Sequence, residues 1–359
     1  MRGLAGGKPW ILMEQATNAV NWRASNAPKA PGQMEALSMQ AIARGADGIM
    51  FFQWRQSRSG SEKFHSAMLP HTGTDTRTWR EVLQLGTHLH SLPELPTADT
   101  GALIGLVFDW ENMWAIAGAD HPVELDYQGL IKRWHAALHR QHYQVDIVHP
   151  GSDLTGYRLV IAPHLYLLRD EDAASLTTFV AEGGHLLVGP FSDIVDEHDA
   201  FRDGGYTTQL GEMLGLFLED FGALVPPHLP GPGQRHATVG WPDGAYRGEY
   251  VAEELRVKAA KVIARYTDGR LTGQPAATTN AYRDGRAHYL GTIPDDAGLA
   301  AVTGWAARQA GISPLLEGIN EHVELGRRHG NVFAINHGLR AENVRGHVLR
   351  PFEWTVVRS

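Results

Sequence analysis

A glutamate near the start of the sequence is the first candidate for chemistry. Glu14 follows the apolar run 10–13 (WILM), which predicts a buried strand, and polar residues follow it. In an α/β barrel the reacting groups lie at the carboxyl ends of the strands, where Glu14 would stand. A single carboxylate in such a place is more often a structural hydrogen-bond acceptor, so its role depends on its neighbours.

Two loops supply neighbours that suit a sugar. The first loop follows Glu14 and contains Trp22, and the second follows the expected strand 49–54 and contains Glu62 and His65. Loops after consecutive barrel strands face the same mouth of the barrel. A tryptophan offers a stacking face, while glutamate and histidine exchange hydrogen bonds with hydroxyl groups in fixed directions. The residues therefore predict a sugar pocket around Glu14.

The elements that must position these residues form two β/α units in series. A helix is expected from about residue 31 to 43 after the first strand, and another from 77 to 90 after the second. A closed barrel needs eight such units and about 250 residues. We therefore expect 1–95 to be the C-terminal portion of a TIM barrel, formed by its last two β/α units.

A second domain is expected over 96–318, after a proline-containing linker. Strands that alternate with helices predict a parallel, doubly wound α/β sheet with both faces covered. The expected strands are 102–109, 145–148, 158–162, 185–189, 259–266 and 276–289, the last with a turn at 284–285. The expected helices are 127–143, 171–182, 210–216 and 295–310. The segment 226–247 is rich in proline and glycine and is expected to be a long loop.

The last part of the sequence, 319–359, is expected to form a small antiparallel β domain. Short strands are predicted over 323–327, 332–336 and 351–357, with a tight turn at 329–331.

Composition excludes several classes of function. The net charge of -8 and the lack of a lysine or arginine cluster argue against nucleic-acid binding. No apolar stretch approaches the roughly 20 residues of a membrane helix, and the first residues lack the apolar core of a secretory signal, so a cytoplasmic location is expected. The sequence has no cysteine, which excludes disulfides, thiolate metal sites and a cysteine nucleophile.

A series of ordered motifs points to a known family. The motifs are 10–15 (WILMEQ), 20–22 (VNW), 46–48 (ADG), 52–56 (FQWRQ) and 62–66 (EKFHS). Together they closely resemble the microbial β-galactosidases of glycoside hydrolase family 42. The motifs 108–112 (FDWEN), 146–150 (DIVHP) and 160–163 (VIAP) resemble the trimerisation domain of that family. The resemblance covers nearly the whole sequence.

The resemblance implies a retaining glycosidase that acts on β-galactosides without a cofactor. Glu14 matches the family's nucleophile, and Trp22, Glu62 and His65 match positions that bind the galactosyl unit. It also implies a homotrimer. The family's acid/base glutamate, which follows an asparagine on an earlier barrel strand, has no counterpart in this sequence. We therefore expect a truncated chain that is inactive, or nearly so, by itself, since loss of a general acid typically costs about 10²- to 10⁴-fold in rate.

Other carboxylates near Glu14 do not replace the missing acid. Glu35 is expected in the first helix, Asp47 at the entry of a strand, and Glu62 already has a binding role by resemblance. An alternative function therefore stays open, namely a non-catalytic oligomerisation or sugar-binding module derived from the family.

Other features of the sequence could be interpreted as amidotransferase, carboxylate or metal sites. The second domain resembles flavodoxin-like and class I glutamine amidotransferase folds, but amidotransferase chemistry needs a nucleophile that is usually cysteine. Asp109 and Glu111 end a strand, and a turn or interface cluster is the favoured interpretation there. His135 and His139 lie four residues apart on a predicted helix, but no HExxH pattern accompanies them, so no metal site is expected.

Overall fold

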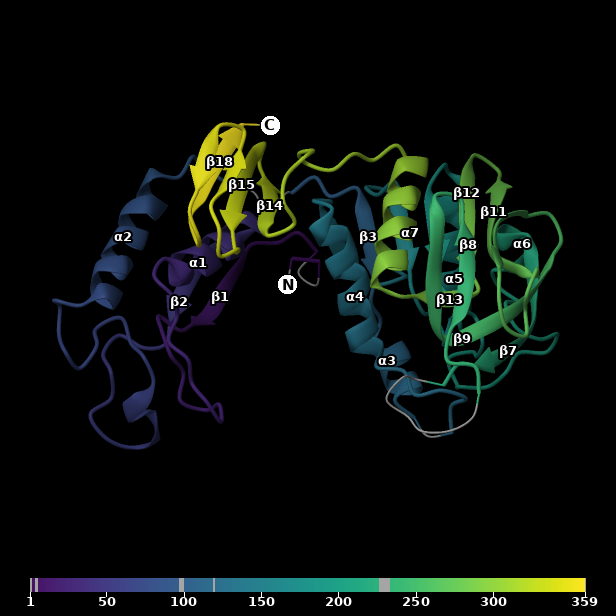
Figure 1. Ribbon diagram of the computed structural model, residues 1–359, viewed down its shortest axis with the longest axis horizontal. Helices are drawn as coiled ribbons and strands as arrows, with labels where there is room; N and C mark the ends of the chain where they lie inside the picture. The colour runs from purple at the N-terminus through teal and green to yellow at the C-terminus, as the bar shows by residue number, and fades with distance from the viewer. Residues whose placement is uncertain (1, 4–5, 97–99, 119, 226–232, 359) are drawn as a thin grey trace. The chain divides into compact units, whose positions relative to one another are not determined.

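The computed structural model describes residues 2–3, 6–96, 100–118, 120–225 and 233–358. It divides into two compact units, shown in Figure 1: unit 1 consists of Met1–Gly101 and Pro314–Ser359, and unit 2 of Ala102–Ser313. The C-terminal strands therefore share a unit with the first hundred residues, although they are distant in sequence. Among the described residues, no helix combines the length and apolar character needed to cross a bilayer.

The first part of unit 1 contains two β/α units. Strands β1 (Trp10–Gln15) and β2 (Ala46–Phe51) pair in parallel. Helices α1 (Gln33–Ala43) and α2 (Arg77–Ser91) follow them, and a short 3₁₀ helix, η1 (Ser61–Phe64), lies in the second loop. Strand β2 begins and ends three residues earlier than the expected strand 49–54. The polar residues 53–56 therefore lie in the loop that follows it.

The C-terminal strands of unit 1 are antiparallel, as expected from the sequence. The order is β14-β15-β18, and β16 and β17 form a separate hairpin. Their bounds are β14 Val323–Arg328, β15 Asn331–Asn336, β16 Glu342–Val344, β17 His347–Leu349 and β18 Trp354–Arg358. Ile335 of β15 packs against Met34 and Met39 of α1, and the Arg328 guanidinium donates to the carbonyls of Ile42 and Ala46. Apolar burial and a buried cation thus join the two parts of unit 1.

Unit 2 is built on one 11-stranded sheet. The strands are β3 Ile104–Val107, β4 Val145–Val148, β5 Leu159–Ala162, β6 His185–Val188, β7 Leu216–Ala223, β8 Ala237–Trp241, β9 Gly244–Val257, β10 Lys261–Tyr266, β11 Pro275–Tyr282, β12 Gly285–Leu290 and β13 Thr292–Pro294. The path is β13-β9-β8-β10-β11-β12-β6-β5-β3-β4, and β7 pairs with β9. Only β4, β3, β5, β6 and β12 are parallel, so the expectation of a parallel sheet was wrong for the antiparallel remainder.

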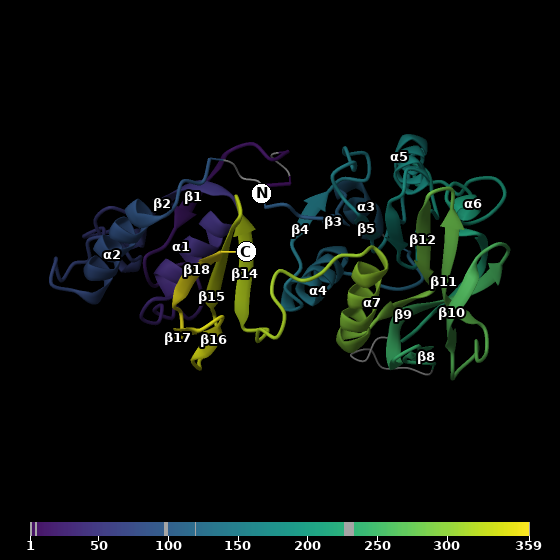
Figure 2. The same cartoon turned by 90° about the horizontal axis from the view of Figure 1, so that it is seen from above.

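Helices cover both faces of the unit 2 sheet, as predicted. They are α3 Trp110–Ile116, α4 Tyr127–Arg140, α5 Asp170–Ala181, α6 Gly211–Leu214 and α7 Asp296–Gln309. Figures 1 and 2 show α4 and α7 on one side of the sheet and α5 on the other. The strands of the parallel part are almost fully buried, which explains their continuous apolar sequences.

The expected loop over 226–247 was wrong in its described part. Residues 237–241 and 244–257 form the antiparallel hairpin β8–β9, in which Trp241 pairs with Gly244 across Pro242 and Asp243. Residues 226–232 lie outside the described residues. Proline, aspartate and glycine in succession are typical of a tight hairpin turn. Together with the alternating burial of β8, these three residues identify the hairpin.

Candidate active site

Glu14 lies at the carboxyl end of β1, at the edge that it shares with β2. The two strands are parallel, and the Phe52 N–H extends their pairing by donating to the Gln15 carbonyl at 3.1 Å. The register shifts between Leu12 and Gln15, which interrupts the alternation of side chains beside Glu14. Such irregularities commonly redirect side chains next to functional sites. The Glu14 side chain is exposed, with no hydrogen-bond or ion-pair partner in the described part of the chain.

Hydrogen bonds hold the loop after β1 against the loop after β2. Four bonds join the loops: Thr17 Oγ1 to the Ala67 carbonyl (2.9 Å), Asn18 N to Ser66 Oγ (2.9 Å), Ser66 N to the Ala19 carbonyl (2.9 Å), and Asn21 Nδ2 to the Ser61 carbonyl (2.6 Å). Because the loops are bonded along their length, the residues they contain share the edge of the sheet at which Glu14 lies.

The three expected binding residues differ in their surroundings. Trp22 is 65% exposed, and the Arg23 guanidinium lies 5.3 Å from its ring centroid. Glu62 is half-buried in η1, and its carbonyl accepts from the His65 N–H at 3.0 Å. His65 is only 2% exposed and packs edge-on against Phe52, with ring centroids 4.9 Å apart. Glu62 and His65 are therefore adjacent, whereas no bond or ring contact in the described residues joins either of them to Glu14 or Trp22.

The ring orientation of His65 is fixed by its backbone neighbour. His65 Nδ1 lies 2.8 Å from the Ser66 carbonyl oxygen. Because that oxygen can only accept, Nδ1 carries the hydrogen and donates it. When the ring is neutral, Nε2 is left as an acceptor for a hydroxyl group.

Lys29 is a positioning residue that the sequence did not identify. Its ammonium donates to the carbonyls of Ala16 (2.5 Å) and Asn18 (3.3 Å), at the base of the loop that contains Trp22. Burial, and secondarily the charge of Arg23, lowers the pKa of Lys29. The prolines at 28 and 31 around it are the only sequence signal of a fixed position.

The other acidic residues near Glu14 in sequence have different partners. Glu35 on α1 accepts from His88 and Trp354, and Asp47 at the beginning of β2 pairs with Arg328. The beginning of β2 is at the opposite edge of the sheet from the end of β1, since the strands are parallel. These positions agree with the expectation that neither residue replaces a general acid beside Glu14.

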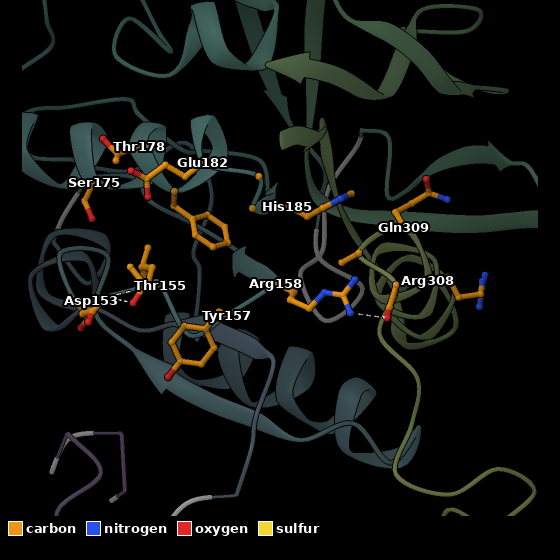
Figure 3. Close-up of a pocket in the computed structure, with 17 residues that line it drawn as sticks. Asp153, Thr155, Tyr157, Arg158, Ser175, Thr178, Glu182, His185, Arg308 and Gln309 are labelled. Carbon is orange, nitrogen blue, oxygen red and sulfur yellow. Dashed lines mark hydrogen bonds between the residues drawn. The ribbon is translucent and has the colours of Figure 1, made fainter. Parts of the chain in front are cut away.

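Unit 2 contains an open cavity of about 700 Å³. Thr178 of α5, Glu182 just after it and Gln309 at the end of α7 line the cavity (Figure 3). Arg158 also lines it, and its Nη1 donates to the Gly311 carbonyl at 3.0 Å. Arg158 precedes β5 and His185 begins β6, so the cavity lies at the amino ends of the parallel strands. Doubly wound sheets bind ligands at the carboxyl ends, so this cavity is not in the usual position for an active site.

The residues at the carboxyl ends of the parallel strands β3 and β6 in unit 2 have structural roles. Phe191 follows β6 in a left-handed conformation (φ 60°), is 2% exposed and offers no nucleophile. Asp109 accepts from the backbone N–H groups of Glu111 (3.1 Å) and Asn112 (3.3 Å) and so caps α3, in agreement with the structural interpretation of this cluster.

Comparisons with known proteins identify the class of protein that this fold and site define. Residues 102–313 match a family model described as the β-galactosidase trimerisation domain, and residues 1–92 match the β-galactosidase model of the same family. A crystal structure of a β-galactosidase from Bacillus circulans sp. alkalophilus superposes with a TM-score of 0.88 at 30% identity, over 100% of this chain and 55% of that chain. The α/β fold is therefore similar to that of family 42 β-galactosidases.

Sequence relatives agree with the structural comparison. A β-galactosidase of Geobacillus sp. (strain Y412MC61) is 41% identical over 94% of this chain and 50% of its own length. A β-galactosidase of Arthrobacter sp. is 41% identical over 96% of this chain and 49% of its own. The chain belongs to glycoside hydrolase family 42, as the motifs predicted, and it spans about half the length of the curated relatives it matches.

Proposed function

We propose that this chain supplies the nucleophile side of a retaining β-galactosidase site, with Glu14 as the nucleophile. The observation that supports this most directly is the bonded pair of loops, which keeps Trp22, Glu62 and His65 at the same sheet edge as Glu14. The Glu14 carboxylate is exposed and has no partner among the described residues, so its oxygens are accessible to an anomeric carbon. In this proposal unit 1 contains the last two β/α units of a TIM barrel, and unit 2 is a flavodoxin-like oligomerisation domain.

The proposed reaction proceeds in two displacements. A Glu14 carboxylate oxygen forms a bond to the anomeric carbon while the bond to the leaving oxygen breaks, and a general acid protonates that oxygen. Water, deprotonated by the same group, then attacks the anomeric carbon and releases Glu14. Trp22 would stack on the galactosyl ring, and Glu62 and His65 would bind its hydroxyls.

The proposal assigns the acid/base role to a carboxylate outside residues 1–359. Retaining enzymes place the two carboxyl groups about 5 to 5.5 Å apart, and Glu35 and Asp47 are bound elsewhere in unit 1. We therefore expect little hydrolysis of ordinary galactosides by the isolated chain. Domain limits of 1–95, 96–318 and 319–359 and a homotrimeric assembly belong to the same proposal, and light scattering that found only monomer would count against the assembly.

A substrate that needs no general acid tests Glu14 directly. Dinitrophenolate is a good leaving group without protonation, so 2,4-dinitrophenyl 2-deoxy-2-fluoro-β-galactoside can react with a nucleophile alone. The expected result is one fluorogalactosyl group per chain by intact mass spectrometry, located on the peptide that contains Glu14. The fluorine slows the second displacement, so the ester accumulates.

Two variants make the labelling experiment decisive. Glu14→Gln should abolish labelling, whereas Glu94→Gln, which changes an exposed carboxylate elsewhere in unit 1, should leave it unchanged. Labelling of another residue, equal labelling of Glu14→Gln, or no labelling of the unmodified chain would each overturn the nucleophile assignment. In the last case, a non-catalytic sugar-binding or oligomerisation module becomes the better description.

A further inference from the structure

Unit 1 contains a second cavity, formed by α1, α2 and the segment that leads into β18. Its volume is about 780 Å³, within the range of small-molecule sites. We call it the α1–α2 groove and define it by six of its lining residues: Glu35, Gln84, His88, Ser91, Phe352 and Trp354. Pro31 and Gly32, at the end of the loop that follows β1, also line the cavity.

Glu35 is the central polar residue of the α1–α2 groove. It is only 5% exposed, yet it lines the cavity. Its Oε1 accepts from both His88 Nδ1 and Trp354 Nε1, the latter at 2.7 Å. Its Oε2 has no hydrogen-bond partner among the described residues, and it is not enclosed by protein atoms either. A carboxylate oxygen that is open to the cavity and has no protein donor can accept a hydrogen bond from water or from a ligand.

His88 extends the polar surface of the groove. Because its Nδ1 donates to Glu35, the ring is held in one orientation, and its side chain remains 37% exposed. Its ring meets the Trp354 indole edge-on, with centroids 5.7 Å apart. The exposed part of the imidazole, the amide of Gln84 and the hydroxyl of Ser91, which donates to the His88 carbonyl at 2.8 Å, also line the groove.

The charges of the groove are largely balanced. Glu81, which also lines it, pairs with Arg77 at 2.8 Å, and Glu353 pairs with Arg350 at 2.6 Å. Glu35 is therefore the lining carboxylate that keeps an oxygen free for a ligand. Because these pairs use the other lining charges, the open Glu35 Oε2 is the acceptor that a neutral ligand rich in hydroxyl groups can use.

We propose that the α1–α2 groove is a saccharide-binding site. A sugar hydroxyl donates to Glu35 Oε2, a neighbouring hydroxyl bonds to His88 or Gln84, and an apolar face of the ring lies against the half-buried Phe352 and Trp354. The site does not take part in the displacement at Glu14, so binding at the groove and hydrolysis are separate properties.

The Trp354 indole provides a local readout, because it donates to Glu35 and lines the groove. In the chain labelled with ¹⁵N at its ten tryptophan indoles, the Trp354 signal is assigned by its loss in Trp354→Phe. Titration with methyl β-galactoside or methyl β-glucoside should move that signal saturably. In Glu35→Gln, binding should weaken about tenfold or more, since a hydrogen bond to a charged group is lost.

Controls separate a ligand site from a structural role. Gln84→Ala and Ser91→Ala change exposed groove residues and should each weaken binding without affecting folding, so they test the site even if Glu35→Gln is unstable. Thr87→Ala, on the same helix but outside the groove, should bind normally. No shift of the Trp354 signal with either sugar, or a shift only with n-butylammonium chloride that added salt abolishes, would overturn the proposal. Failure of Glu14 labelling leaves this result unaffected.

Discussion

Glu253 in unit 2 should make the stability of this protein strongly dependent on pH. The residue lies in β9, is 0% exposed, and has no cationic partner among the described residues. Its Oε1 accepts from the Phe191 N–H at 2.7 Å, and its Oε2 accepts from the Tyr289 hydroxyl at 2.8 Å. Burial raises the pKa of Glu253 from 4.5 to about 8, and these two hydrogen bonds only partly oppose the shift.

The magnitude follows from the two pKa values. Below pH 4.5 the carboxyl is protonated in both the folded and the unfolded chain, and its contribution to stability is complete. Above pH 4.5 only the unfolded chain ionises, so stability falls by about 1.4 kcal/mol per pH unit until the folded pKa of about 8 is reached. The full loss is roughly 5 kcal/mol, a large part of the stability of an ordinary domain.

Glu253→Gln removes this dependence while keeping the hydrogen bonds. The amide has the shape of a protonated carboxyl, so its oxygen can accept from Phe191 and its NH₂ can donate to Tyr289. Urea unfolding followed by circular dichroism from pH 5 to pH 9 should show the free-energy difference between variant and unmodified chain rising with pH in favour of the variant. Other titrating groups cancel in that difference.

Glu254→Gln is the matched control, because the adjacent Glu254 is partly exposed and pairs with Arg270 at 3.0 Å. Its free-energy difference should change little across the same pH range. If the Glu253→Gln difference were also constant from pH 5 to pH 9, the carboxylate would be ionised in the folded protein, and the reasoning from burial would be wrong.

Two further predictions concern other buried residues. Arg328→Met should destabilise unit 1 by about 2 kcal/mol or more, because Arg328 is 1% exposed and donates to the carbonyls of Ile42 and Ala46, which would lose that donor; an unchanged thermal midpoint for unit 1 would contradict this. Burial lowers the pKa of His288 to about 3, so its contribution to stability is present above pH 6.5 and is lost as pH falls toward 3. His288→Gln should therefore unfold at a lower pH in an acid titration, and an unchanged acid midpoint would disprove the assignment.

Sequence periodicity predicted most elements of the fold, for identifiable reasons. The apolar run 10–13 predicted the start of β1 and missed its end by two residues, and α2 and α7 begin within a residue of their expected starts. The run was expected to be buried, but Ile11 and Met13 are exposed. The hairpin β8–β9 was missed because its proline and glycine residues have the composition of a loop. Glu253 shows the limit of such reasoning, since it lies in a polar-looking stretch and is buried only through the packing of the complete sheet.

The candidate site was predictable by residue type but not by its supporting contacts. Glu14, Trp22, Glu62 and His65 stand out because of their motifs, and their roles remain a proposal. The cited bonds between the two loops and the contacts of Lys29 run from side chains to backbone carbonyls, which every residue provides. Sequence alone does not determine such contacts, because they depend on how distant segments meet.

The discontinuity of unit 1 has a consequence for how the chain folds during synthesis. Arg328 reaches the Ile42 carbonyl across 286 positions, and Phe333 of β15 completes the core around Ile42 and Ala43. Those partners are synthesised only after all of unit 2, so unit 2 can fold before the core around Ile42 and Ala43 is complete. Strand β1 contributes Trp10 to the same cluster, so the segment that contains Glu14 completes its packing only after β15 has been synthesised.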